Sequence, residues 1–141
     1  LEVTEAFRPD AIVLQCGADA VEEDPLSRLA LSNNAHWDVV RALMPLTERL
    51  LVLGGGGYNP WSVGRLWTGV WATLNRAEIP ERLPREAEDI LRALKWPGRR
   101  AGRTPPDHWF TTLADAPRRG PVRDAVRDRL TELTGRLRVW A

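Results

Sequence analysis

The run of four consecutive glycines, Gly54 to Gly57, constrains the fold of this chain more than any other feature of its sequence. It follows directly on the apolar segment 49–53 and leads directly into Tyr58. Glycine loses more conformational freedom on folding than any other residue, so four in a row are costly unless the backbone needs them. The run therefore indicates positive φ angles or a very close approach of the backbone to another group. A plain flexible turn is the alternative.

Phosphate-binding loops are also rich in glycine, but the spacing here does not fit them. No Gly-Lys-Ser/Thr sequence follows the run, as a Walker A loop would require. The dinucleotide pattern G-x-G-x-x-G fails too, because it would need glycine where Asn59 or Pro60 stands. Another interpretation is the wall of a narrow channel with Tyr58 at its end, since a phenol can donate a hydrogen bond to a developing oxyanion.

Two helices are predicted in the first half of the chain. The first begins at Asn33 or Asn34 and runs to about Met44, with apolar residues at helical spacing. The second begins at Asn59 and Pro60, because asparagine caps helices and proline fits their first turn. Its apolar stripe includes the tryptophans, which are expected in the core: Trp61, Trp67 and Trp71.

Each of these helices follows a short apolar segment, 11–16 or 49–53, with the length of a buried strand. Strand, helix, strand and helix in alternation are typical of a parallel α/β sheet. In such sheets ligands bind at the carboxyl ends of the strands. The loops that leave these two ends contain Asp19 and Tyr58, which makes them candidate site residues.

Two further helices are predicted in the second half, at 84–95 and 121–138, separated by a loop rich in Pro, Gly and Arg at 95–109. The first has its apolar residues on one side, and the second has an apolar stripe that is expected to be buried. These sides comprise Ile90, Leu91 and Leu94 in the first helix and Val122, Val126, Leu130, Leu133 and Leu137 in the second.

The composition, 43% apolar and 28% charged, is that of a globular protein. No apolar stretch reaches the roughly 18 residues of a membrane span, so no membrane partner is expected. Cys16 is the only cysteine, which excludes a disulfide within these 141 residues and favours a reducing, cytoplasmic location. Arginines gather in the second half but alternate with Glu and Asp, as on solvated helices, so a nucleic-acid partner is not expected.

Few other side chains suit catalysis. Asp19 lies between small residues, where a carboxylate can approach a metal closely, although a turn-stabilising aspartate is the simpler interpretation. His36 falls in the first turn of a helix, which favours a surface or capping role, and His108 beside Trp109 favours packing. Cys16 lies in a buried strand and is expected to be a small core residue rather than a nucleophile.

Three segments, FRPDAIVLQCGAD, DPLSRLALS and LLVLGGGGYNPWSVGRLWT, resemble the C-terminal half of the histone deacetylase-like domain. The segments NPWSVGRLWTGVWATLN and HWFTTLADAPRRGP are most similar to the bacterial acetoin-utilisation deacetylases. The resemblance implies that residues 1–75 form the C-terminal part of a catalytic domain. Residues 76–141 would form an Arg-rich helical extension that packs on it.

This resemblance implies an α/β fold of the arginase/deacetylase type, with a mostly parallel sheet flanked by helices. The family site holds one Zn²⁺ with two Asp and one His, and Asp19 matches the second Asp. Tyr58 matches the tyrosine that stabilises the transition state. Leu26 matches a position that lines the acyl-lysine channel, and Gly56 and Gly57 match the channel wall.

The activity so implied is hydrolysis of an acetylated protein lysine or a small acetylated amine, by a bacterial, cytoplasmic enzyme. The remaining zinc ligands, the histidine base and the ligands of a monovalent cation are expected upstream of this chain. Because the first residue is Leu1 and the only methionine is Met44, the chain is expected to be a fragment. Without the upstream groups it is expected to be inactive alone. An inactive remnant or interaction module of the same fold is the alternative, and the oligomeric state is left open.

Overall fold

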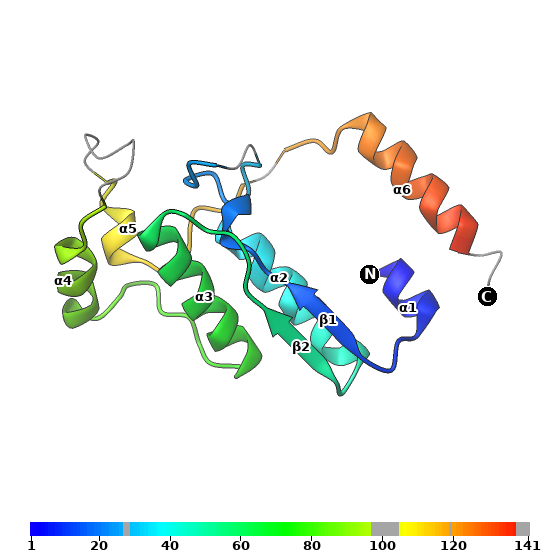
Figure 1. Ribbon diagram of the computed structural model, residues 1–141, viewed down its shortest axis with the longest axis horizontal. Coiled ribbons are helices and arrows are strands. Elements are labelled where there is room, and N and C mark those ends of the chain that lie inside the picture. The colour runs from blue at the N-terminus through cyan, green and yellow to red at the C-terminus, as the bar shows by residue number, and fades with distance from the viewer. Residues whose placement is uncertain (27–28, 97–104, 119, 138–141) are drawn as a thin grey trace.

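The computed structural model describes residues 1–26, 29–96, 105–118 and 120–137 (Figure 1). The predicted longer elements are present with ends shifted by a few residues, whereas the short segments α1, η1, η2 and α5 have no counterpart in the prediction. Most of the predicted Pro/Gly/Arg-rich loop, 97–104, lies outside the described residues. The elements are, in order, α1 (Glu2–Phe7), β1 (Ile12–Gln15), η1 (Ala18–Ala20), α2 (Asn33–Leu43), η2 (Met44–Leu46), β2 (Leu50–Leu53), α3 (Pro60–Leu74), α4 (Arg85–Ala93), α5 (His108–Thr111) and α6 (Asp124–Leu137).

Strands β1 and β2 form a parallel pair, with Ile12 opposite Leu50 and Gln15 opposite Leu53. Parallel strands need a crossover connection, and α2 provides it here. The two carboxyl ends therefore lie side by side and point the same way, as Figure 1 shows. The loops that follow them, η1 and the glycine run, leave the sheet at one edge.

The core lies between the sheet and the helices α2 and α3. Leu14 and Val52, on the inner side of the strands, pack against a cluster of buried residues. That cluster comprises Cys16, Ala18, Val21, Trp37, Val40, Leu66, Val70 and Leu113. Burial raises the pKa of the Cys16 thiol, and only 3% of this residue is exposed, so the expected core role is confirmed.

Helix α3 begins where the sequence predicts. The side-chain oxygen of Asn59 accepts hydrogen bonds from the backbone N–H of Trp61 at 3.1 Å and of Ser62 at 3.4 Å. These bonds satisfy two donors that the first turn leaves free, and Pro60 fits that turn without losing a bond. The cap fixes the point at which the chain turns from the glycine run into the helix.

A buried ion pair joins α3 to the segment after α5. Arg65 is 1% exposed, and its Nη2 lies 2.7 Å from Oδ1 of Asp115. Asn33 at the start of α2 adds three bonds: its side-chain amide donates to the carbonyl of Leu113, its backbone N–H donates to Asp115, and its side-chain oxygen accepts from the Asp115 N–H. Residues 108–115 thus complete the same core as the first half of the chain.

The strands differ from the prediction in one respect, because they are buried on one face only. Val13, Leu51 and Leu53 are 64%, 54% and 43% exposed. Among the described residues, α2 and α3 both lie on the opposite face, so these side chains have no covering layer. The side chains of these two apolar strands, which were predicted to be buried, therefore alternate between a covered face and an open face.

Two expectations about buried helix residues were wrong. In and just before α6, four of the residues expected to be buried are exposed: Val122, Val126, Leu130 and Leu133. The reason is that α6 contacts α1 rather than the core (Figure 1), and the side chain of Leu137 lies outside the description. Trp71 in α3, which was expected in the core, is 63% exposed. In and just after α4, Ile90 and Leu94 are exposed and Glu88 is buried.

No helix in the described part of the chain has both the length and the apolar character needed to cross a bilayer.

Breaking the Arg65–Asp115 pair should destabilise the fold strongly. Asp115→Asn leaves the Arg65 guanidinium buried without its counter-charge, which is expected to cost about 3–5 kcal/mol of unfolding free energy. Asp38→Asn is the matched control, since the Asp38–Arg41 pair is largely exposed and should contribute less than about 1 kcal/mol. Urea denaturation of both variants gives the two values. Equal small losses would mean that residues 108–115 do not anchor the core.

Candidate active site

Asp19 lies in the η1 turn, four residues beyond the end of β1. Its side chain is half-buried, and its carboxylate takes part in no hydrogen bond or ion pair within the described residues. The turn-stabilising role, in which the carboxylate would bond its own backbone, is therefore not the one it plays. A partly buried, unsatisfied carboxylate is available to a cation.

The glycine loop explains why this carboxylate can sit where it does. A β-carbon at Gly56 would collide with the carboxylate of Asp19. The amide N–H of Ala18 also donates to the carbonyl of Gly56, at 2.6 Å. The close backbone approach expected from the sequence is thus confirmed, and the neighbour is the turn that carries Asp19.

Gly57 meets the other expectation, that of a positive φ. Its φ is +146°, in the region that residues with a side chain rarely adopt. A β-carbon there would also lie 2.7 Å from Cγ2 of Val63 and 2.9 Å from Cβ of Ala18. This position requires glycine for both its conformation and its space, so a plain flexible turn does not account for the run.

Two further side chains support these loops, although neither was predicted to belong to the site. The amide of Gln15 lies against Gly55, where any side chain would overlap with it. Nε2 of His36 lies 3.1 Å from the carbonyl oxygen of Gly17, within hydrogen-bonding distance. A role as helix cap or surface residue was expected for His36, but it braces the backbone just before Asp19.

Tyr58 and Leu26 are linked by Asp24, whose carboxylate accepts a hydrogen bond from the backbone of each. The backbone N–H of Leu26 donates to Oδ1 of Asp24 at 2.9 Å, and that of Tyr58 donates to Oδ2 at 2.7 Å. The side chains of Tyr58 and Leu26 are 50% and 68% exposed. The five residues predicted for the site therefore lie on two loops that contact each other at Gly56 and through Asp24.

A zinc ion would find one ligand at this edge. Catalytic zinc sites take three protein ligands, usually His together with a carboxylate. Asp19 fits that role through its unsatisfied carboxylate and the side-chain-free loop beside it. His36 is turned to Gly17, and both oxygens of Asp24 accept backbone N–H groups. The described residues thus fit as one member of a ligand set.

A separate cluster brings ligand atoms of Glu23, His108 and Asp115 within 4.8 Å of one another. Burial raises the pKa of Glu23, and the charge of Asp115 raises it further. Burial and the Arg65 guanidinium lower the pKa of His108. Both oxygens of Asp115 already have partners, Arg65 and the N–H of Asn33, and the Arg65 charge opposes a second cation. The cluster is best explained by the closure of the core.

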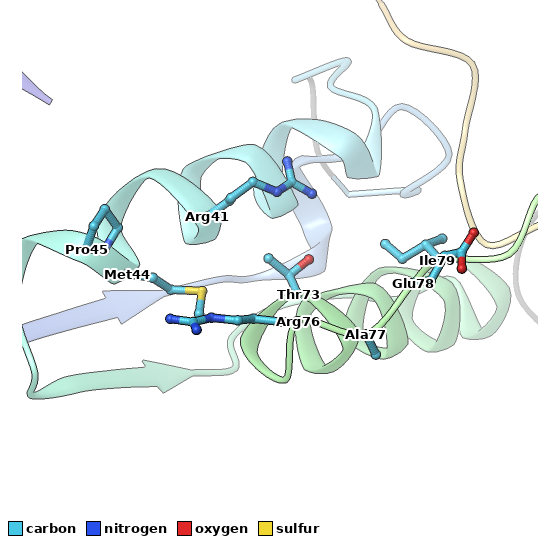
Figure 2. A pocket seen from close by; sticks show the side chains of 8 residues that line it. All are labelled: Arg41, Met44, Pro45, Thr73, Arg76, Ala77, Glu78 and Ile79. Carbon is cyan, nitrogen blue, oxygen red and sulfur yellow. The ribbon is translucent and has the colours of Figure 1, made fainter.

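The open pocket in Figure 2 is also separate from the site. Its volume is about 620 Å³, and it lies where α2 and α3 end. Its lining residues include none of the five predicted site residues: Arg41, Met44, Pro45, Thr73, Arg76, Ala77, Glu78 and Ile79. Helix C-termini carry partial negative charge, which arginines balance, and this accounts for Arg41 and Arg76 without a ligand.

Residues 1–74 match the Histone deacetylase domain family. Histone deacetylase 9 of Arabidopsis thaliana is 41% identical over 83 residues, which are 59% of this chain and 20% of that protein. Histone deacetylase 3 of Oryza sativa subsp. japonica is 40% identical over 83 residues, 59% of this chain and 16% of that protein. The chain belongs to the histone deacetylase domain family.

Solved structures agree with this assignment. The crystal structure of an HDAC homolog from Aquifex aeolicus matches with a TM-score of 0.79 and 30% identity, over 94% of this chain and 37% of that one. An HDAC homolog complexed with SAHA matches with a TM-score of 0.80 and 29% identity over the same shares. The predicted deacetylase-like α/β fold is confirmed, and the chain spans well under half the length of these relatives.

A methyl group at Gly57 should disturb the loop. Gly57→Ala places a side chain at a φ of +146° and against Val63 and Ala18, so we expect it to lower the unfolding free energy by about 1–3 kcal/mol. Gly64→Ala is the matched control, because Gly64 is exposed in α3 with open space around it. Helix propensity should make that variant up to about 1 kcal/mol more stable. Thermal unfolding measures the stability of both variants. Equal stabilities of Gly57→Ala and Gly64→Ala would contradict the strain assigned to a side chain at position 57.

Proposed function

We propose that this chain is the C-terminal part of the catalytic domain of a zinc-dependent deacetylase. The substrate would be an acetylated protein lysine or a small acetylated amine, whose amide bond is hydrolysed. One observation carries the proposal. In a chain of the histone deacetylase domain family, Asp19 and Tyr58 leave the carboxyl ends of two paired parallel strands, on loops that contact each other.

Asp19 is proposed as a metal ligand. Its carboxylate is unsatisfied among the described residues, and the lack of a side chain at Gly56 gives the carboxylate room to lie there. A bound zinc ion would supply Lewis-acid polarisation of the acetyl carbonyl and would lower the pKa of a bound water. The other two ligands, the histidine base and the ligands of a monovalent cation are proposed to lie outside this chain, which alone would be inactive.

Tyr58 is proposed to donate a hydrogen bond to the oxyanion of the tetrahedral state. Half of the residue is exposed, which leaves it open to a substrate. Leu26 would line the acyl-lysine channel, and Gly56 and Gly57 would form a wall. A long, thin acyl-lysine needs a passage without obstructing side chains, and glycines provide one.

The organisation and setting of the protein are proposed on the same basis. Residues 1–75 would belong to the catalytic domain and 76–141 to a helical extension that packs on it, as the Arg65–Asp115 pair supports. The amino-acid sequence of the segment 59–75 favours the bacterial acetoin-utilisation branch of the family. A buried, unpaired Cys16 is consistent with a cytoplasmic location.

The role of Asp19 can be tested by metal content. In the intact enzyme, Asp19→Asn should lower the zinc bound per molecule after dialysis, because a neutral amide is a far weaker ligand than a carboxylate. Asp10→Asn, an exposed aspartate before β1, is the control and should keep full occupancy. Metal analysis by mass spectrometry gives the ratio. Full zinc content in Asp19→Asn would remove Asp19 from the ligand set.

The role of Tyr58 can be tested by kinetics. Tyr58→Phe in the intact enzyme should lower kcat on the order of 10²–10³-fold with KM nearly unchanged, because the phenol bonds an oxygen that gains its charge only in the transition state. Phenylalanine keeps the ring, so the fold should survive. Steady-state assays on an acetyl-lysine substrate decide the matter. A kcat within about threefold of wild type would return the GGGGY segment to a purely structural role.

A further inference from the structure

The buried carboxylate of Asp24 joins the two loops of the site. Asp24 is 2% exposed. A charge so deep in the protein is tolerated only when hydrogen bonds compensate it. Its two oxygens accept from the N–H of Leu26 and from that of Tyr58, at 2.9 and 2.7 Å, although Tyr58 is 34 positions further along the chain.

This contact matters because little else described here holds Tyr58 in place. Gly57, directly before it, has a φ open to few other residues, and the loop contains no other side chain for four positions. The tyrosine residue is half exposed, so packing restrains it little. Its placement therefore depends on where the backbone at Tyr58 is held, and Asp24 holds that backbone on one side.

On the other side Asn59 fixes the chain to the same neighbour. Asn59 is fully buried, and its side-chain amide donates to the carbonyl of Glu23 at 3.2 Å while its oxygen caps α3. The segment Glu23–Asp24 thus clamps the chain at Tyr58 and Asn59. Because Asp24 also binds the N–H of Leu26, the clamp sets the tyrosine and the proposed channel residue relative to each other.

We propose that Asp24 is a positioning residue, whose carboxylate places Tyr58 and Leu26 for the reaction by binding both of their backbone N–H groups. Because only 2% of Asp24 is exposed and each oxygen already accepts a backbone N–H, the residue is placed to act through these two backbone groups rather than on the substrate itself. This inference rests on the proposed function, in which Tyr58 acts on the oxyanion. The effect of Asp24 on catalysis must then pass through Tyr58.

The kinetic test is a double-mutant cycle in the intact enzyme. Asp24→Asn keeps one acceptor oxygen and replaces the other with an NH₂ group, which cannot accept. We expect kcat to fall on the order of 10–100-fold while KM stays within about threefold, as for a misplaced catalytic group. In the double variant, Asp24→Asn should cause no further loss beyond that of Tyr58→Phe, because both changes remove the same contribution.

The outcomes separate this inference from the proposed function. If Tyr58→Phe alone leaves kcat unchanged, the proposed function fails. The positioning role is overturned if Tyr58→Phe lowers kcat and Asp24→Asn lowers the kcat of that variant further. It is also overturned if Asp24→Asn leaves kcat unchanged both in wild type and in Tyr58→Phe. Asp89→Asn, an exposed aspartate in α4, is the control and should match wild type in both backgrounds.

A second measurement guards against a variant that is merely unstable. In Asp24→Asn, amide hydrogen exchange at Tyr58 or Leu26 should quicken about tenfold or more, while Val70 in the core keeps its protection. A general loss of protection would make Asp24 a residue of fold stability and would overturn the proposal. Unchanged exchange at Tyr58 and Leu26 would do the same, since both N–H groups would then be held without it.

Discussion

The close packing of the glycine loop against the η1 turn is the constraint on which the site depends. The two loops follow neighbouring parallel strands, so the sheet brings them to one edge. They meet with the Ala18 N–H bonded to the Gly56 carbonyl and with Asp19 lying over Gly56. A side chain at Gly55, Gly56 or Gly57 would meet Gln15, Asp19 or Ala18. The run of glycines is therefore needed for contact between protein segments, in addition to any channel for a substrate.

Much of this arrangement could be predicted from local sequence. The Asn59–Pro60 cap, the two apolar strands and the conformational demand of the glycine run all depend on residues close together in the chain. The strand faces could not be predicted, because an apolar strand reads the same whether one or both of its faces are covered. The burial of the apolar stripe in α6 was predicted wrongly for a related reason. Val126 and Leu130 have helical spacing, but no described part of the core faces them.

Asp24 makes one hydrogen bond that local sequence predicts and one that it does not. The Asp24–Pro25 pair is a turn signal, and the bond to Leu26 two residues later is the kind that such a turn makes. The bond to Tyr58 spans 34 positions, and no sequence pattern near either residue predicts it. The same holds for Asp115, whose partners Asn33 and Arg65 lie far away in the sequence. Long-range pairs of buried polar groups are fixed by the fold and have no local pattern of their own.

These long-range bonds also bear on how far the family fold extends. The family match ends at residue 74, yet the similarity to the Aquifex aeolicus homolog covers 94% of the chain. Leu113 belongs to the core, and residues 108–115 bind α2 and α3 through Asn33 and Arg65. The segment after residue 74 therefore supports α2, whose His36 contacts Gly17, and α3, which begins just after Tyr58 and Asn59. It carries no residue proposed for catalysis.

The proposed chemistry requires that Asp19 and Tyr58 face one reacting group from two adjacent loops. A crystal structure of the intact enzyme with zinc and a bound acetyl-lysine amide tests it most directly. We expect a carboxylate oxygen of Asp19 about 2.0–2.2 Å from the zinc. The Tyr58 hydroxyl should lie about 2.6–3.2 Å from the acetyl oxygen. A metal held by Glu23, His108 and Asp115 instead, or a Tyr58 ring turned away from the amide, would contradict the account.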